Sequence, residues 1–356
     1  MSEAPRRKSR WKRRLLFLAL IAGGLFVYSL QFHPEREDWA GQRAKLAQRQ
    51  VVAPPARIDA AQVLGDVQTL AAPAMEGRAV GKPGGKRARE YLLARFAELK
   101  LEPAFGKSYE QPFRFTPFRG VMFWRKSFWQ KKDPLDGVNL AGIVRGTVDP
   151  THFLVVSAHY DHLGIRDGKL YPGADDNASG TATMLAAARW FAAHPPRHSI
   201  LFVAFDGEER GLKGAEAFVA SPPVPLAQLL VDVNFDMVSR NVDREIFVTG
   251  LYANPQLAPM VDAVRAHAQP TMLYGHDFPR PFWDMDDWTD QSDQGAFADQ
   301  GIPFLYLGVA DHPDYHQPTD TFEHIEPPFF LSVVESVIDL VTSLDAADAA
   351  ALRKAK

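Results

Sequence analysis

The sequence has 356 residues, of which 46% are hydrophobic and 23% are charged, a balance typical of a folded chain with one large core. This composition excludes a disordered or collagen-like protein. The absence of cysteine excludes disulfide bonds, thiolate metal ligands and a cysteine nucleophile. Seven Lys or Arg residues lie in the first 14 positions, so the net charge of −3 hides a more acidic remainder, and we expect no nucleic-acid partner.

The N-terminus combines the basic segment 1–14 with a nearly continuous apolar run, Leu15–Leu30, that carries no charge. No small residues at cleavage-site spacing follow the run, so the pattern favours an uncleaved signal anchor over a cleavable signal peptide. The run is shorter than the roughly 20 residues that span a bilayer, and a core helix is the alternative. The positive-inside rule predicts a cytoplasmic segment at 1–14, a transmembrane anchor at 15–31 and the remainder on the extracytoplasmic side, periplasmic or extracellular.

Residues 32–57 are mostly polar and contain a proline pair near their end, which predicts a linker before a globular domain at 58–348. Within that domain, apolar periodicity predicts a helix over Lys86–Leu99. The segment 109–132 interleaves aromatic with basic residues and has neither helical nor strand periodicity. We interpret it as an insertion whose aromatic side chains pack on the domain; a lid over a site and a contact with the membrane surface are the alternatives.

The rest of the chain alternates between strand-like and helix-like segments. Strands are predicted at Phe153–Ser157, Ser199–Phe205, Leu229–Phe235, Glu245–Thr249 and Ile302–Leu307, and helices at Gly180–His194, Leu212–Ala220 and Pro255–Ala268. This alternation predicts an α/β fold of three layers, with a mostly parallel central sheet and helices on both faces.

Polar clusters follow three of the predicted strands directly. The clusters are His159 with Asp161, Asp206 with Glu208 and Glu209, and Asp236. Ligands of open α/β sheets bind in the crevice beyond the carboxyl ends of the strands, so these side chains should meet in space. His316, which follows the last predicted strand, can join them.

A separate acidic stretch, Gly173–Gly180, reads Gly-Ala-Asp-Asp-Asn-Ala-Ser-Gly. Its adjacent aspartates, Asp175 and Asp176, need a partner charge or a metal ion if they are buried. Zinc accepts imidazole and carboxylate ligands, and two zinc ions about 3.5–4 Å apart share a bridging carboxylate. One of the two aspartates could supply that bridge.

The polar residues suffice for two metal ions. The expected ligand pairs are His159 with Asp236 and Glu209 with His316. Glu208 is then free beside the ions to act as general base on a water molecule. Asp161 can accept the second ring N–H of His159 and fix its tautomer. Four histidines have no matching partner in the sequence, and we interpret them as surface or loop residues: His152, His162, His267 and His324.

These residues lie in six motifs. The motifs are His159-Tyr160-Asp161, Gly173–Gly180, Phe205–Leu212, Asn234-Phe235-Asp236-Met237, Ser292-Asp293-Gln294 and Tyr315–Thr321. In order and spacing they resemble the co-catalytic di-zinc aminopeptidases, a family typified by bacterial secreted leucyl aminopeptidases that includes glutamate carboxypeptidase II and the glutaminyl cyclases. The resemblance spans Ala61–Glu326 and implies a fold of the zinc-dependent exopeptidase type.

The resemblance implies two Zn²⁺ ions, with Asp176 rather than Asp175 as the bridging ligand and a peptide bond after it that is often cis in relatives. It implies the same ligand pairs as above, Glu208 as the base, and Asp161 as the partner of a histidine ligand. Tyr315 matches a tyrosine that, in some relatives, donates a hydrogen bond to the oxyanion of the tetrahedral intermediate.

The expected function is that of a metallo-aminopeptidase, a hydrolase that acts on peptides with a free N-terminus. Gln294 stands where many relatives have a histidine, a change that bears on substrate contacts. A glutaminyl cyclase-like or carboxypeptidase-like enzyme and a catalytically inactive, receptor-like relative are the alternatives, and the complete ligand set with Glu208 favours the hydrolase. An acidic run could help to hold the α-ammonium group of the substrate, or could be a solvated loop: Asp284, Asp286, Asp287 and Asp290.

Overall fold

The structure is a computed structural model that describes residues 38–49, 51, 57–117, 133–277 and 286–353. The chain divides into a short N-terminal unit, residues 1–42, and a large unit, residues 43–356. The predicted cytoplasmic segment and anchor lie outside the described residues, as does most of the predicted insertion. Among the residues that are described, no helix is long and apolar enough to cross a bilayer.

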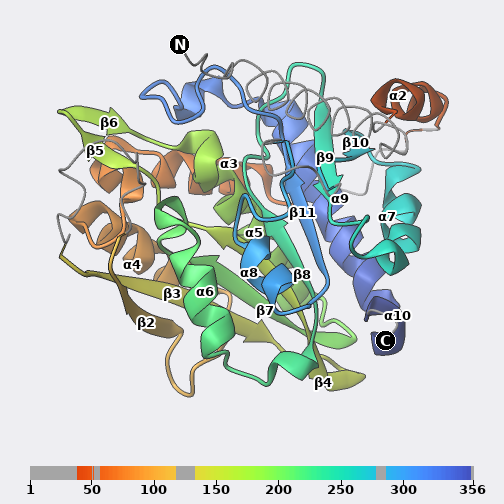
Figure 1. The fold of residues 1–356 in the computed structure, drawn as a ribbon, viewed down its shortest axis with the longest axis horizontal. Coiled ribbons are helices and arrows are strands. Elements are labelled where there is room, and N and C mark those ends of the chain that lie inside the picture. The colour runs from red at the N-terminus through yellow and green to blue at the C-terminus, as the bar shows by residue number, and fades with distance from the viewer. Residues whose placement is uncertain (1–37, 50, 52–56, 118–132, 278–285, 354–356) are drawn as a thin grey trace, which may run out of the picture. The chain divides into compact units, whose positions relative to one another are not determined.

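A nine-stranded sheet forms the centre of the large unit (Figure 1), with the strand order β1-β3-β7-β4-β8-β11-β9-β10 and β2 paired with β3. Its strands are β1 (Glu102–Pro103), β2 (Glu110–Phe115), β3 (Leu135–Val144), β4 (Asp149–His159), β7 (His198–Phe205), β8 (Leu229–Phe235), β9 (Glu245–Thr249), β10 (Thr271–Tyr274) and β11 (Phe304–Gly308). The central strands β7, β4, β8 and β11 run parallel, as predicted, whereas β3 and β9 join this core antiparallel. Two short strands, β5 (Gly164–Arg166) and β6 (Lys169–Tyr171), form a separate hairpin.

Helices cover both faces of this sheet. They are α3 (Ala60–Leu70), α4 (Pro83–Glu98), α5 (Gly180–Ala193), α6 (Lys213–Ala220), α7 (Ala258–Arg265), α8 (Gln294–Asp299), α9 (Pro327–Ala346) and α10 (Ala349–Leu352), and α2 (Trp39–Ala47) lies within the predicted linker. The predicted helices at Lys86–Leu99, Gly180–His194, Leu212–Ala220 and Pro255–Ala268 correspond to α4, α5, α6 and α7.

Successive residues of β4 divide the core between the two faces. Leu154 and Val156 belong to the larger core, to which α3, α5 and α9 contribute. Phe153 and Val155 belong to the smaller core, with Phe297 of α8 and residues of α6. Figure 1 shows α6 and α8 on the near side of the sheet. The predicted three-layer α/β fold is therefore confirmed.

The first part of the segment 109–132 is not an irregular insertion. Glu110–Phe115 forms β2, which pairs antiparallel with β3, and the rings of Phe113 and Phe115 stack with their centroids 5.9 Å apart. An edge strand is buried on fewer sides than a central strand, so its sequence lacks the apolar continuity that identifies buried strands.

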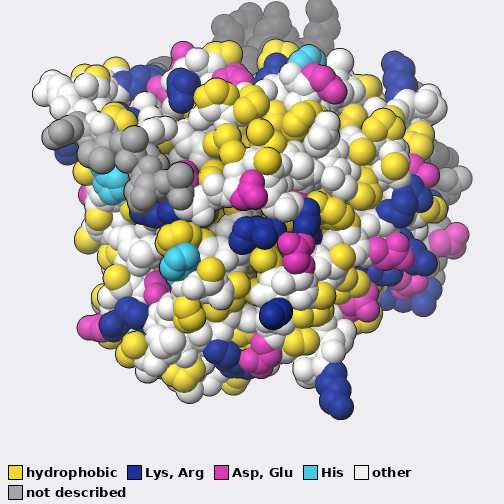
Figure 2. All heavy atoms as spheres, turned by 180° about the vertical axis from the view of Figure 1, so that it is seen from behind, with side chains coloured by type: hydrophobic (Ala, Val, Ile, Leu, Met, Phe, Trp, Pro, Cys, Tyr) yellow, Lys and Arg dark blue, Asp and Glu magenta, His cyan; other side chains and the backbone are white. Residues whose placement is uncertain are grey.

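The surface of the protein mixes charges of both signs. Figure 2 shows Lys and Arg side chains interspersed with Asp and Glu on the face opposite to that of Figure 1. Within α4, for example, Arg95 and Glu98 form an ion pair at 2.7 Å. Neighbouring charges of opposite sign largely cancel at a distance. A concentrated group of carboxylates lies instead at the carboxyl ends of the central strands.

Candidate metal centre

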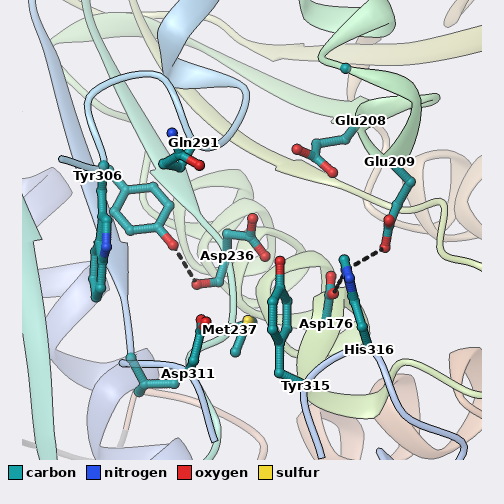
Figure 3. Close-up of a pocket in the computed structure, with 13 residues that line it drawn as sticks. Asp176, Glu208, Glu209, Asp236, Met237, Gln291, Tyr306, Asp311, Tyr315 and His316 are labelled. Carbon is teal, nitrogen blue, oxygen red and sulfur yellow. Dashed lines mark hydrogen bonds and ion pairs between the residues drawn. The ribbon is translucent and has the colours of Figure 1, made fainter. Parts of the chain in front are cut away.

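The parallel strands deliver three of the predicted clusters to one edge of the sheet. His159 is the last residue of β4 and pairs in register with Phe205, the last residue of β7. The short helical turn Glu208–Arg210 follows β7, and Asp236 follows β8. Figure 3 shows the carboxylates of these segments directed toward a common space. The crevice expected beyond the strand ends is therefore where the polar side chains meet.

Asp176 lies in a tight turn, Ala174–Ser179, that is held from both sides. The fully buried Arg78 donates hydrogen bonds to five backbone carbonyl groups, including that of Asp176. The carboxylate of Asp320 accepts the backbone N–H groups of Asp175 at 2.9 Å and Asp176 at 3.0 Å. Burial lowers the pKa of Arg78 to about 10, so its guanidinium stays charged at neutral pH. The peptide bond after Asp176 is cis.

The carboxylate of the neighbouring Asp175 is engaged elsewhere. Its Oδ1 accepts hydrogen bonds from the backbone N–H of Ser239 at 2.8 Å and from the hydroxyl of the same residue at 2.7 Å. Its Oδ2 lies 3.0 Å from Nε2 of His312. These contacts tie the turn to the loops that follow β8 and β11, so Asp176 is the aspartate of the stretch that faces the other predicted ligands.

The two carboxylate oxygens of Asp176 face two different groups of side chains. Oδ1 lies 3.6 Å from Nε2 of His159, which lies 3.3 Å from Oδ1 of Asp236. Oδ2 lies 3.1 Å from Nε2 of His316, which lies 3.4 Å from Oε1 of Glu209. Atoms bound to one zinc ion at about 2.0–2.1 Å with tetrahedral angles lie roughly 3.3 Å apart. Both groups have this spacing, and Asp176 joins them.

Several of these atoms are buried and have no hydrogen-bond partner in the described structure. They are Nε2 of His159, Oδ1 of Asp236 and Oε1 of Glu209. Buried polar atoms without partners are rare in native proteins, and a coordinated cation accounts for such atoms when imidazoles and carboxylates converge. The residues therefore fit two zinc ions.

Asp161 contacts the ring of His159 in a different way from the predicted one. Nδ1 of His159 donates to the backbone carbonyl of Asp161 at 3.1 Å, whereas the carboxylate of Asp161 lies 3.7 Å from that nitrogen. The carboxylate instead accepts the backbone N–H of Glu208 at 3.0 Å. The carbonyl group fixes the tautomer that leaves Nε2 of His159 available to a metal ion.

Glu208 lies beside the first ligand group. Its Oε2 is 3.9 Å from Nε2 of His159, and its side chain is 15% exposed to a cavity of about 490 Å³. Burial raises the pKa of Glu208 well above its ordinary value; His159 opposes this shift, and the carboxylates of Glu209 and Asp236 add to it. A bound cation would stabilise the carboxylate and lower this pKa again, which suits a general base.

His162 lies in a loop, as one of the two interpretations had it, but it is neither at the surface nor without a partner. Its side chain is fully buried, and its Nδ1 lies 2.8 Å from Oε1 of Glu209 and 3.5 Å from Oδ2 of Asp176. The other three histidines of that set are partly or fully exposed. His152 and His324 pair with residues nearby in the sequence, and His267 lies 3.4 Å from Asp339 of α9. The short separation of His162 from His159 in the sequence could have indicated its position, because a loop that turns back after a strand can bring a second histidine to the same site.

Tyr315 forms part of the cavity wall. Its ring stacks on that of His316 with centroids 4.0 Å apart, and Figure 3 shows its hydroxyl directed toward the carboxylates. Burial and the charges of Asp176 and Asp236 raise the pKa of Tyr315, so the hydroxyl remains a hydrogen-bond donor. The apolar side chains of Met237 and Trp288 also line the cavity.

Gln294 is not among the residues that line the cavity. It is fully buried, accepts a hydrogen bond from Nδ2 of Asn234 at 2.9 Å and donates to the carbonyl of Trp288 at 2.6 Å. Trp288 does line the cavity, so Gln294 contacts the wall of the site from behind. Asp284 of the acidic run lies outside the described residues, and the three described members of that run are not among the cavity-lining residues, whereas Asp311 is.

Two residues that hold the site, Arg78 and Asp320, were not among the predicted site residues. Asp320 lies inside the motif Tyr315–Thr321, close to the predicted ligand His316 in the sequence. Arg78 donates to backbone carbonyl groups that are mostly distant in the sequence. Every residue has such a group, so the sequence does not show which of them Arg78 contacts.

Comparison with known proteins agrees with this geometry. The model of Peptidase family M28 matches residues 139–341. A probable zinc metalloprotease of Pyrenophora tritici-repentis (strain Pt-1C-BFP) is 33% identical over 111 residues, which cover 30% of this chain and 26% of that protein. Aminopeptidase YwaD of Bacillus subtilis (strain 168) is 30% identical over 197 residues, which cover 52% of this chain and 40% of that protein. The chain thus spans less than half the length of each of these two relatives.

The fold has a close counterpart among solved structures. The aminopeptidase from Aneurinibacillus sp. strain AM-1 superposes with a TM-score of 0.63 at 17% identity, over 80% of this chain and 93% of that one. The family match covers more than half of the chain and contains all the predicted ligands. The chain therefore belongs to Peptidase family M28.

Proposed function

We propose that the chain is a two-zinc aminopeptidase that hydrolyses the first peptide bond of substrates with a free N-terminus. The observation that carries this proposal is the geometry of Asp176, whose two oxygens lie 3.6 Å from His159 and 3.1 Å from His316. Two ions that share a carboxylate form the kind of site that activates water for hydrolysis. The family, and the likeness to aminopeptidase YwaD, support a peptidase.

Zinc ions bound by these residues would lower the pKa of water toward about 7 and polarise the scissile carbonyl group. Glu208 takes a proton from the attacking water molecule and returns it to the leaving amine. The N–H contact with Asp161 fixes the backbone of Glu208 while the proton moves. The hydroxyl of Tyr315 donates a hydrogen bond to the oxygen that becomes negative when the carbonyl carbon is attacked.

The cavity supports a preference for an apolar first residue. Met237, Trp288 and Val309 give it apolar walls, and its volume of about 490 Å³ accommodates a large side chain. Asp311, which is exposed at the cavity, replaces the acidic run as the group that we propose attracts the α-ammonium of the substrate.

The test is hydrolysis of aminoacyl-nitroanilides by the purified full-length protein in detergent. Leucyl-nitroanilide should be cleaved, its N-acetylated form should not, and a chelator should abolish the activity until zinc is restored. Activity that survives exhaustive metal removal would contradict the zinc mechanism.

The same preparation separates the alternatives. A glutaminyl cyclase would convert N-terminal glutamine to a pyroglutamyl group without shortening the peptide. A carboxypeptidase would remove residues from the other end, and mass spectrometry of a digested peptide distinguishes the two ends. A receptor-like relative would bind zinc or a protein partner and turn over none of these substrates.

We also propose that residues 15–31 anchor the protein, with residues 1–14 in the cytoplasm and the zinc-binding domain on the extracytoplasmic side. The uncharged run after a basic segment supports this topology. Alkaline carbonate washing should leave the full-length protein in the membrane pellet, and its release would contradict the anchor. Protease added outside the membrane should digest the domain.

A further inference from the structure

His162 has contacts that an ordinary buried histidine does not have. Its Nδ1 lies 2.8 Å from Oε1 of Glu209, and neither atom has a hydrogen-bond partner of good geometry among the described residues. Its Nε2 also lacks a hydrogen-bond partner there. By contrast, the buried His198 and the 11% exposed side chain of His312 each pair with an aspartate. In this respect the ring resembles that of His159.

The distances place Nδ1 of His162 in the second ligand group. It lies 3.5 Å from Oδ2 of Asp176, and the rings of His162 and His316 have centroids 5.8 Å apart. The donor atoms of His162, Asp176 and Glu209 all lie within 4.8 Å of one another. His316 contacts the same two carboxylates, at 3.1 Å from Asp176 and 3.4 Å from Glu209. Atoms that share one zinc ion are separated by roughly 3.3 Å.

The turn that carries Asp176 packs closely against the imidazole ring of His162. Gly173 has a φ of 61°, and a Cβ atom there would lie 2.5 Å from Cδ2 and Cγ of His162. Only glycine leaves that space and tolerates this backbone conformation. The imidazole is thus fixed in position by the stretch that supplies the bridging carboxylate.

We propose that His162 binds zinc through Nδ1 as a fourth protein ligand at the ion held by Asp176, Glu209 and His316. The inference rests on the proposed two-zinc centre and makes its two ions unequal. Four protein ligands close a tetrahedral site, whereas three leave a position open for water or substrate. The open position therefore belongs to the ion held by His159, Asp176 and Asp236.

The position of the base agrees with this asymmetry. Oε2 of Glu208 lies 3.9 Å from Nε2 of His159, beside the group with three protein ligands. Water at the open position would then lie next to Glu208. An ion with four protein ligands would be bound more tightly and would hold the carboxylate of Asp176 in place.

The test is zinc K-edge X-ray absorption of the full-length protein loaded with two equivalents of zinc, which counts imidazole ligands. The wild type should show three imidazoles for two ions, and His162→Gln should show two. His152→Gln, which removes a partly exposed histidine that pairs with Asp149, is the matched control and should still show three. If His162→Gln fails to fold, the number of imidazole ligands in the wild type is sufficient to test the assignment.

Two imidazoles for two ions in the wild type would overturn the assignment and leave His162 as a neighbour that orients Glu209. Loss of such an orienting neighbour also weakens metal binding by about 10–100-fold, so a change in affinity with an unchanged imidazole count would equally overturn it. The imidazole count does not depend on peptidase activity. Failure to bind zinc at all would instead contradict the proposed function.

Discussion

The backbone N–H of Glu208 donates a hydrogen bond to the carboxylate of Asp161 at 3.0 Å, across the gap between the ends of β7 and β4. The same Asp161 accepts from the ring of His159 through its carbonyl group at 3.1 Å. One residue therefore orients the predicted ligand His159 through its backbone and the proposed base Glu208 through its side chain.

Replacing Asp161 should separate these two contacts. Asp161→Ala keeps the carbonyl and so should keep both zinc ions, but kcat should fall about 10- to 100-fold because the Glu208 backbone loses its acceptor. Asp161→Asn retains an oxygen acceptor and should keep most of the activity. Zinc content and nitroanilide kinetics measure both effects, and loss of zinc from Asp161→Ala would show that the carboxylate holds His159 after all.

Tyr315→Phe removes the proposed donor to the developing oxyanion. We expect kcat to fall by up to about 100-fold with little change in KM, because the hydrogen bond forms only in the transition state. The zinc content should stay unchanged. A variant that raises KM at constant kcat would make Tyr315 a substrate-binding residue instead.

Arg78 should contribute strongly to stability, because it is fully buried and its hydrogen bonds satisfy five carbonyl groups. Arg78→Met should lower the free energy of unfolding by at least about 3 kcal/mol, since buried acceptors lose their donors. The control is Arg145→Met. It removes the partly exposed ion pair between Arg145 and Glu102, which should lower the free energy of unfolding by less than about 1 kcal/mol. Urea denaturation of the two variants compares them, and equal losses would contradict the role of Arg78.

Asp232 on β8 should make stability depend on pH. It is fully buried, its Oδ1 accepts from the hydroxyl of Ser157 at 2.8 Å, and burial raises its pKa from 3.8 to about 8 although this hydrogen bond opposes the shift. The folded protein therefore keeps a proton that the unfolded chain releases, so this contribution is full below about pH 4 and is lost as the pH rises through about 8.

Asp232→Asn is neutral at every pH and should flatten this dependence. Its melting temperature relative to the wild type should rise between about pH 5 and pH 9. Asp136→Asn, at a mostly exposed site, is the matched control and should show no such trend. A constant difference across the range would mean that Asp232 is ionised in the folded protein.

Much of the site could be predicted because metal chemistry restricts the residue types. The clusters after β4, β7 and β8 lie at strand ends, and parallel strands bring their carboxyl ends to one edge. Spacing alone does not show whether Asp175 or Asp176 faces the other predicted ligands, since the two are adjacent in the same turn after a glycine. The contacts of Asp175 with Ser239 and His312 provide the physical reason for the choice.

Other features depend on contacts that a sequence does not display. Arg78 acts through backbone carbonyls, and Gln294 acts through the carbonyl of Trp288. His162 lies in a loop where no periodicity shows which way its ring points. The edge strand β2 was missed because its partner, β3, was not predicted.

The most direct test of the two-ion centre is the amount of zinc bound per chain, measured by mass spectrometry of metals on the purified full-length protein. The wild type and Glu208→Gln should each bind two ions, with Glu208→Gln losing about 10²- to 10⁴-fold in kcat, while Asp176→Ala should bind one ion or none. A wild type that binds a single ion at saturating zinc, or an Asp176→Ala variant that keeps two, would contradict the bridging role of Asp176.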